Sequence, residues 1–265
     1  MLADKEKILL RYNEGDEDSR HGRSRNQSLE FYYTEKHLGH FIKPGSRVIE
    51  LGCATGYYAM RFADKCAEYF GVDLVPKHIA QFKEKIASSG LKNVGCALGD
   101  ATGLTFIPDS CFDVVLCLGP MYHLSPSERS KAFTECARVC KPGGIAAFAY
   151  INACGVYAGA CITAPEVYPN ALTNDNVFRI GTDDLRPGLF WYTSPEEIEV
   201  EAKSRGLTKI FDLGTDFFIF ANCVDSMDDA RFELMRPLYD KMIFSESCTG
   251  LSNHALLVCR KENEK

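Results

Sequence analysis

The strongest constraint on the fold is a regular alternation of short apolar runs and amphipathic segments between residues 45 and 150. The apolar runs have the length of buried strands, and the segments between them repeat apolar residues at helical spacing. We expect strands at 47–51, 69–72, 94–98, 112–118 and 145–150, and helices at 57–66, 77–88 and 127–140. Strands that alternate with helices at this spacing predict a parallel sheet covered on both faces, the doubly wound α/β class.

After residue 150 this alternation stops. Residues 151–193 contain several glycines, prolines and aromatic residues and show little periodicity. A loop of this length inside a compact domain usually has a function, so we expect it to form a lid. The pattern then resumes with a helix at 195–204, strands at 208–213 and 254–260, and a helix-prone insertion at 226–246. Together these elements predict a mostly parallel sheet of seven strands.

Charge and hydropathy disfavour two kinds of partner. The net charge is -6, and no long run of Lys and Arg occurs. A protein that neutralises many phosphates needs a basic surface, so nucleic acid is a disfavoured partner. No apolar run reaches the roughly 18 residues that a membrane span needs, so we expect no membrane partner. The N-terminus also lacks the charged and then apolar pattern of a secretory signal.

The cysteines indicate the compartment. Most of the 12 cysteines lie inside apolar runs, and no Cys-x-x-Cys pair occurs. This pattern is typical of free thiols that act as small core residues in a reducing environment, so we expect a cytoplasmic protein. Cys136 and Cys140 lie one helical turn apart, but no further His or Cys is close to them in sequence. We therefore expect no metal site.

A glycine-containing turn follows the first expected strand, with Glu50, Gly52, Ala54 and Gly56 at alternate positions. Such a turn lets the backbone approach a ligand closely, and the helix that follows favours hydrogen-bond acceptors at its N-terminus. Acidic residues also end the next two strands. Asp73 is placed to bind ribose hydroxyls, and Asp100 is placed to accept a hydrogen bond from an adenine amino group. All three carboxylates are expected at the carboxyl edge of the sheet, where open α/β sheets bind ligands.

A dinucleotide is the main alternative ligand for such a turn. The dinucleotide fingerprint Gly-x-Gly-x-x-Gly needs its last glycine for close packing of helix and strand. Here Ala54 follows Gly52, and Tyr57 stands where that last glycine would fall. A Gly-x-x-x-x-Gly-Lys-Ser/Thr phosphate loop is also absent. The sequence therefore disfavours a nicotinamide dinucleotide and a nucleoside triphosphate.

The ordered set of motifs resembles class I S-adenosylmethionine-dependent methyltransferases. Residues 50–56 are similar to the first motif of that family, with Ala54 in place of its usual middle glycine. Residues 71–74 resemble its ribose-binding motif, and 99–101 its adenine-contacting motif. Residues 112–116 and 138–144 resemble its fourth-strand motif and the turn before its fifth strand. The resemblance covers roughly residues 45–150 in the correct order.

This resemblance implies a Rossmann-like methyltransferase fold with S-adenosyl-L-methionine as the cofactor. It implies that Gly52 and Gly56 allow passage of the methionine part, and that Glu50 faces its amino group. Asp73 is then expected at the ribose and Asp100 at the adenine. The full set of residues expected at the cofactor is Glu50, Gly52, Cys53, Gly56, Asp73, Leu74, Asp100, Ala101 and Leu118.

We expect four regions along the chain. They are an N-terminal helical cap (1–44), a cofactor-binding α/β core (45–150), the lid insertion (151–193), and the C-terminal part of the core with its helical insertion (194–265). The cap contains Arg20, His21, Arg23 and Arg25, which are either a solvated surface or part of a segment that folds over the pocket. A methyl donor must be shielded from water, so we expect the cap and the lid to close over the site.

His123 is the candidate catalytic residue, because it follows the fourth strand, where this family places groups that face the transferred methyl. Its side chain can take a proton near neutral pH. The alternative is a histidine that bonds the lid or lines the cofactor pocket. The expected partner is a small-molecule methyl acceptor; a methyltransferase for RNA or protein and a catalytically silent cofactor-binding protein remain alternatives. No motif specifies the acceptor, the methylated atom or the oligomeric state.

Overall fold

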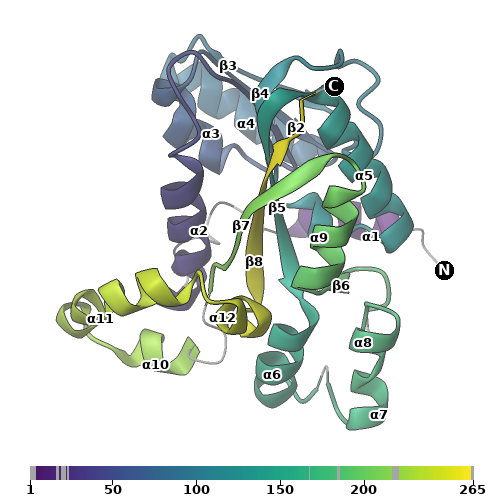
Figure 1. Cartoon of the computed structure of the whole chain (residues 1–265), viewed down its shortest axis with the longest axis vertical. Coiled ribbons are helices and arrows are strands. Elements are labelled where there is room, and N and C mark those ends of the chain that lie inside the picture. The colour runs from purple at the N-terminus through teal and green to yellow at the C-terminus, as the bar shows by residue number, and fades with distance from the viewer. Residues whose placement is uncertain are drawn as a thin grey trace.

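A single twisted sheet forms the centre of the molecule, as the computed structural model shows (Figure 1). The structure describes residues 4–15, 18, 22, 24–166, 168–183, 186–216 and 221–263. The strands are β1 (Arg47–Leu51), β2 (Glu68–Asp73), β3 (Val94–Leu98), β4 (Phe112–Cys117), β5 (Cys140–Asn152), β6 (Tyr192–Thr193), β7 (Leu207–Gly214) and β8 (His254–Lys261).

The strand order is β3-β2-β1-β4-β5-β8-β7, and the two-residue β6 pairs with the end of β5. The first five strands are parallel, and β8 runs antiparallel to both β5 and β7. This topology confirms the predicted doubly wound, mostly parallel sheet. Strand β5 begins at Cys140, five residues earlier than predicted, because Cys140 already pairs with Phe112 of the neighbouring strand β4.

Helices cover both faces of the sheet because the central strands are buried on both sides. On one face lie α2 (Arg25–Leu38), α3 (Tyr57–Phe62) and α4 (Pro76–Ser89), and on the other lie α5 (Pro126–Val139) and α9 (Pro195–Lys203). Tyr33, Phe62 and Phe82 are fully buried in the first core. Phe133 and Phe148 pack together in the second, with ring centroids 4.3 Å apart.

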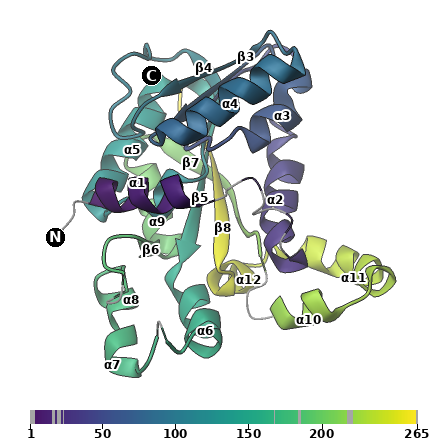
Figure 2. The ribbon, with the colours of Figure 1, turned by 180° about the vertical axis from the view of Figure 1, so that it is seen from behind.

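The prediction that residues 151–193 lack regular secondary structure is wrong. This stretch contains the helices α6 (Ala153–Thr163), α7 (Ala171–Asn174) and α8 (Asn176–Arg179), which lie below the carboxyl edge of the sheet (Figure 2). Helix α6 has small and apolar residues around its whole circumference, so it shows no helical period in the sequence. The expected helical insertion is present and comprises α10 (Ala221–Ser226), α11 (Asp229–Met242) and α12 (Glu246–Leu251).

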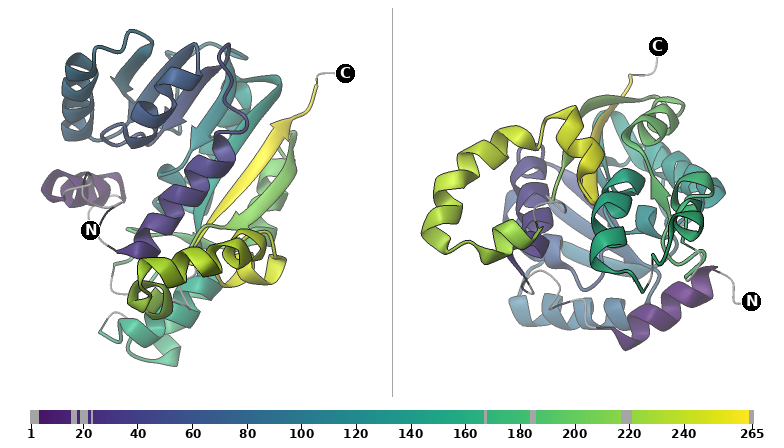
Figure 3. Two further views of the ribbon diagram at one scale, coloured as in Figure 1. Left: turned by 90° about the vertical axis from the view of Figure 1, so that its left-hand side faces the viewer. Right: turned by 90° about the horizontal axis from the view of Figure 1, so that it is seen from below.

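The first helix, α1 (Asp4–Glu14), lies apart from the main body of the sheet and crosses its carboxyl edge (Figure 3). The views of Figure 3 also place α10 and α11 beside α2. Across the part of the chain that the structure describes, every helix is too short or too polar to pass through a bilayer.

The turn after β1 uses left-handed backbone conformations at three positions. Gly52, Ala54 and Gly56 have φ values of 73°, 45° and 86°. A Cβ atom at Gly56 would lie 2.3 Å from the Phe82 ring, and one at Gly52 would lie 2.5 Å from Pro120. The two glycines therefore permit close packing, whereas Ala54 adopts a conformation that costs an L-residue about 1–2 kcal/mol.

Two substitutions at this turn should separate the effect of side-chain packing on the free energy of unfolding from the effect of backbone conformation. Gly56→Ala should lower the free energy of unfolding by about 2 kcal/mol or more, because the new methyl group meets Phe82 in a left-handed backbone. Ala54→Gly should change it by less than about 1 kcal/mol, because relief of strain offsets the larger entropy of an unfolded glycine. Urea unfolding monitored by circular dichroism measures both. Equal losses in the two variants would contradict this account.

Candidate functional site

Two cavities open at the carboxyl edge of the sheet, on either side of the turn after β1. Both are lined by Gly52, Ala54, Gly119 and Tyr122, so they meet at this point. Cavity A continues toward α1 and the ends of β2 and β3. Cavity B continues toward α2 and α3. The position agrees with the rule that open α/β sheets bind ligands at the carboxyl ends of their strands.

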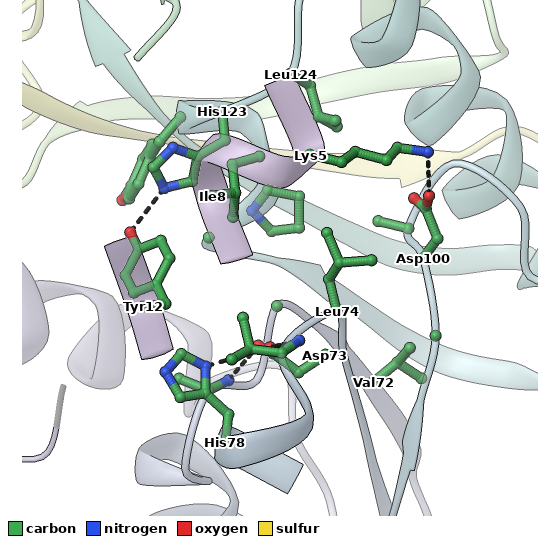
Figure 4. Close-up of a pocket in the computed structure, with 18 residues that line it drawn as sticks. Lys5, Ile8, Tyr12, Val72, Asp73, Leu74, His78, Asp100, His123 and Leu124 are labelled. Atoms are coloured by element: carbon green, nitrogen blue, oxygen red, sulfur yellow. Dashed lines mark hydrogen bonds and ion pairs between the residues drawn. The ribbon is translucent and has the colours of Figure 1, made fainter. Parts of the chain in front are cut away.

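Asp73 lies in the wall of cavity A and holds two turns together (Figure 4). One carboxylate oxygen accepts a hydrogen bond from the Ala54 amide at 2.8 Å, and the other accepts one from the Val75 amide at 2.8 Å. The His78 Nδ1 atom lies 3.2 Å from the second oxygen. Since a carboxylate has about four acceptor positions, Asp73 also has the capacity to bind a ligand hydroxyl.

His78 is a site residue that the sequence analysis missed. It lies in the first turn of α4, lines cavity A and is only 4% exposed. Among the described residues, no group lies within hydrogen-bonding distance of its Nε2 atom. A buried polar atom in a cavity wall usually has a partner, so this nitrogen indicates a polar ligand group beside Asp73. The signal in the sequence was a histidine five residues after the strand-end Asp73.

Asp100 lies at another part of cavity A, where α1 reaches it. The Lys5 ammonium forms a 2.5 Å ion pair with one oxygen of Asp100, and the Thr102 amide and hydroxyl donate to the other. Burial opposes ionisation here, but the hydrogen bonds from Lys5 and Thr102 outweigh it and lower the pKa of Asp100. Asp100 is therefore an ionised acceptor at neutral pH. Leu74 and Ala101 line the same cavity.

Glu50 lies in the wall of cavity B and is 2% exposed. The Tyr69 hydroxyl donates a 2.7 Å hydrogen bond to one of its carboxylate oxygens. Burial raises the pKa of Glu50 to about 8, although the bond from Tyr69 acts in the opposite direction. A carboxyl group in this state gains charge when a cation binds beside it.

The remaining predicted cofactor residues fall into two groups. Cys53 and Leu118 line cavity B beside Glu50, as expected for residues near a ligand. Gly56 is absent from the described lining of both cavities and instead packs against Phe82. The close approach of the Phe82 ring of α4 explains why a glycine is needed at this position. A contact between Gly56 and the cofactor stays a prediction.

His123 connects the segment after β4 with two covering segments. Its Nδ1 atom donates to the Leu189 carbonyl at 2.7 Å, because a carbonyl only accepts. In the neutral ring, Nε2 then accepts the hydroxyl hydrogen of Tyr12, also at 2.7 Å (Figure 4). Phe190 covers the ring with a centroid distance of 5.1 Å. His123 thus lines cavity A while both of its nitrogens bond to protein groups.

Helix α1 and the segment before β6 contact each other over cavity A. The Lys7 ammonium donates to the Pro187 carbonyl at 2.6 Å, and the Arg11 guanidinium lies 5.0 Å from the centre of the Phe190 ring. Of the four basic residues that the sequence analysis singled out in the cap, the structure describes Arg25. Arg25 bonds the carbonyls of Val224 and Met227 and the carboxylate of Asp229, whereas Arg20, His21 and Arg23 lie outside the described residues.

Comparison with known proteins identifies the core. Residues 48–144 match the family model of a methyltransferase domain. A ubiquinone biosynthesis O-methyltransferase of Azoarcus sp. (strain BH72) is 32% identical over 114 residues, which are 43% of this chain and 48% of that protein. An arsenite methyltransferase of Halobacterium salinarum is 25% identical over 193 residues, which are 72% of this chain and 47% of that protein.

The fold is also found in solved structures. The YcgJ protein of Bacillus subtilis is similar with a TM-score of 0.54 and 19% identity, covering 88% of this chain and 100% of that chain. The chain spans about half the length of the two curated relatives above. The methyltransferase-domain match and the ordered motifs support a class I S-adenosylmethionine-dependent methyltransferase domain over residues 48–144. The cofactor of this family is S-adenosyl-L-methionine.

The residues of the two cavities fit this cofactor. The unpaired Nε2 atom of His78 and the carboxylate of Asp73 suit ribose hydroxyls, and the ionised Asp100 suits an amino group of adenine. Glu50, in the other cavity, suits the amino group of the methionine part. Polar groups of the right kind therefore occur on both sides of the Gly52 turn.

Binding of the cofactor product should be coupled to loss of a proton from Glu50. The free carboxyl has a pKa of about 8, and an adjacent ammonium group lowers it by favouring the charged form. Affinity for S-adenosylhomocysteine should therefore rise between pH 6 and about 8 and level off above that value. Calorimetry in buffers of different ionisation enthalpy measures the released protons. Glu50→Gln should remove the part of this release that belongs to Glu50; an unchanged release in the variant would assign it to other groups.

Proposed function

We propose that this protein transfers a methyl group from S-adenosyl-L-methionine to a small molecule. The observation that carries the proposal is the placement of Glu50, Asp73 and Asp100 around two cavities that meet at Gly52. The names of the two relatives, which refer to ubiquinone biosynthesis and arsenite, support a small acceptor. The net charge of -6 supports it further, because it disfavours a polyanionic substrate. The exclusion of nucleic acid stays a prediction.

Bound S-adenosyl-L-methionine supplies an activated methyl group, so the protein contributes mainly alignment and exclusion of water. Cavity B adjoins the shared Tyr122 and is the proposed place of the acceptor. The role of His123 as a base stays a prediction. Its bonds to Tyr12 and Leu189 support the alternative, in which it holds the covering segments over cavity A.

Calorimetry with S-adenosylmethionine and S-adenosylhomocysteine tests the proposed function, with NAD as the comparison ligand. Asp73→Asn should weaken binding by about 1.5–3 kcal/mol, because ribose hydroxyls lose a charged acceptor. Asp64→Asn is the matched control, because Asp64 is an exposed carboxylate outside both cavity walls as described. Heat with NAD and none with either methionine derivative would reject the proposal. Unchanged affinity in folded Asp73→Asn would remove Asp73 from the site.

The covering segments should respond to the ligand. We expect amides of α1 and of residues 186–191 to exchange quickly in the free protein and more slowly with S-adenosylhomocysteine, because gating segments open without global unfolding. Tyr12→Phe should speed exchange in α1, since it removes the bond to His123. Hydrogen exchange followed by mass spectrometry measures both effects. Protection confined to the turns around Gly52 and Asp73 would show that these segments do not close the site.

A further inference from the structure

One wall of cavity B consists of packed aromatic rings. Phe31 of α2 contacts Tyr57 and Tyr58 of α3, with ring centroids 4.8 Å and 6.0 Å apart, and the two tyrosine rings are 5.1 Å apart. All three residues line the cavity. Arg61 lies 4.5 Å over the Tyr57 ring, so one cation already uses this group of rings. Aromatic faces attract cations because their quadrupole is negative above the ring.

A buried carboxylate lies in the wall of the same cavity. Glu30 of α2 is 8% exposed and lines cavity B. One of its oxygens accepts a 2.9 Å hydrogen bond from the Tyr122 hydroxyl. Tyr122 lines both cavities, so this bond fixes the Glu30 carboxylate next to the junction between them.

A histidine lies next to Glu30, and a second carboxylate lies next to that histidine. The Nδ1 atom of His254 lies 3.8 Å from the other Glu30 oxygen and 2.7 Å from an oxygen of Asp216, which is 4% exposed. The His254 amide and the Ser252 hydroxyl also donate to Asp216, so this carboxylate is firmly placed. With both carboxylates ionised, the three side chains carry a net charge of -1 when His254 is protonated and -2 when it is neutral. The group is anionic in either state.

Cationic side chains are few among the described lining residues of cavity B. Among the lining residues that the structure describes, Lys85 is the one cationic side chain, and it forms a 2.6 Å ion pair with Asp18. An acidic acceptor would place a second buried negative charge next to the Glu30 carboxylate, and like charges at short range repel. A basic acceptor gains from both the carboxylate and the rings.

We propose that the acceptor is an amine, which Glu30 and the rings of Phe31, Tyr57 and Tyr58 hold in cavity B. This inference rests on the proposed function and names its substrate class. The neutral amine nitrogen forms the new N–C bond with its lone pair, while the C–S bond of the donor breaks and its electron pair stays on sulfur. The nitrogen lone pair becomes available when the bound ammonium first passes one proton to Glu30 and from there to solvent, and the methylated nitrogen leaves as an ammonium. Tyr122, His254 and Asp216 act as positioning residues.

The test compares isosteric probes that differ in charge. The full chain, saturated with S-adenosylhomocysteine, is titrated with choline, with its neutral isostere 3,3-dimethylbutan-1-ol and with 3,3-dimethylbutanoate, and binding is followed by ligand-observed NMR. Choline should bind about tenfold more tightly than the neutral probe, since a desolvated cation–π contact combined with a carboxylate reaches this magnitude. Equal binding of the three probes, no detectable binding of choline, or preference for the anion would overturn the inference.

Matched variants assign the preference to Glu30. In Glu30→Gln the preference for choline should fall below about threefold, because the charge is lost while the side chain keeps its size. Glu35→Gln on the same helix, whose carboxylate pairs with Arg61 outside the described lining of cavity B, should keep the preference. Tyr122→Phe keeps Glu30 but removes its hydrogen bond, and should give an intermediate value. A preference that survives in Glu30→Gln would overturn the assignment.

A labelling experiment identifies the product class. The protein is incubated with methyl-labelled S-adenosylmethionine and a bacterial metabolite extract, and the labelled products are separated by ion exchange. Label in products that bind a cation exchanger supports the inference, whereas label confined to neutral or acidic products overturns it.

Failure of the proposed function and failure of the amine inference give different results. Absence of S-adenosylhomocysteine binding rejects the proposed function. Normal binding of it without cation preference rejects only the amine, and weakened binding in Glu30→Gln assigns Glu30 to the cofactor instead.

Discussion

The carboxylate of Asp73 is the interaction on which the rest of the site depends. It accepts the amide of Ala54 in the turn after β1 and the amide of Val75 in the turn after β2. A buried amide without an acceptor costs about 1–3 kcal/mol, so one side chain compensates both turns. The same carboxylate orients His78, which brings a second polar atom into cavity A. The bonds that close the two turns therefore shape the wall of the cavity, and the proposed function gives the same carboxylate a second role in binding the cofactor.

The α/β core was predictable because its signals are local. The predicted bounds of β1 and β3 agree with the structure, and β1 is buried at four consecutive residues. The acidic residues Asp73 and Asp100 were placed correctly because parallel strands bring their carboxyl ends to one edge. Helix α6 was missed for the opposite reason. A helix that is apolar on all sides has no periodic pattern, so its sequence could not be distinguished from a loop.

The sequence indicated which segments cover the site, but their contacts could not be predicted, because they join distant parts of the chain. Lys5 meets Asp100 from 95 residues away, and Tyr12 meets His123 from 111 residues away. Nothing in the residues next to His123 shows that both of its nitrogens have protein partners. The sequence therefore left two roles open for His123, a base or a histidine that bonds the lid or lines the pocket, and its neighbours in the fold support the second. Glu30 shows the same limit, because its partners Tyr122 and His254 come from other parts of the sheet edge.

Tyr122 couples the two halves of the site. Its hydroxyl donates to Glu30 in cavity B, and its carbonyl accepts the Trp191 amide at the end of the segment that covers cavity A. The next residue, His123, holds Tyr12 and Leu189. Hydrogen bonds from two adjacent residues therefore connect Glu30 in cavity B with the segments that lie beside cavity A. If the covering segment moves when a ligand binds, as the exchange experiment tests, these bonds predict that Glu30 responds to the same movement.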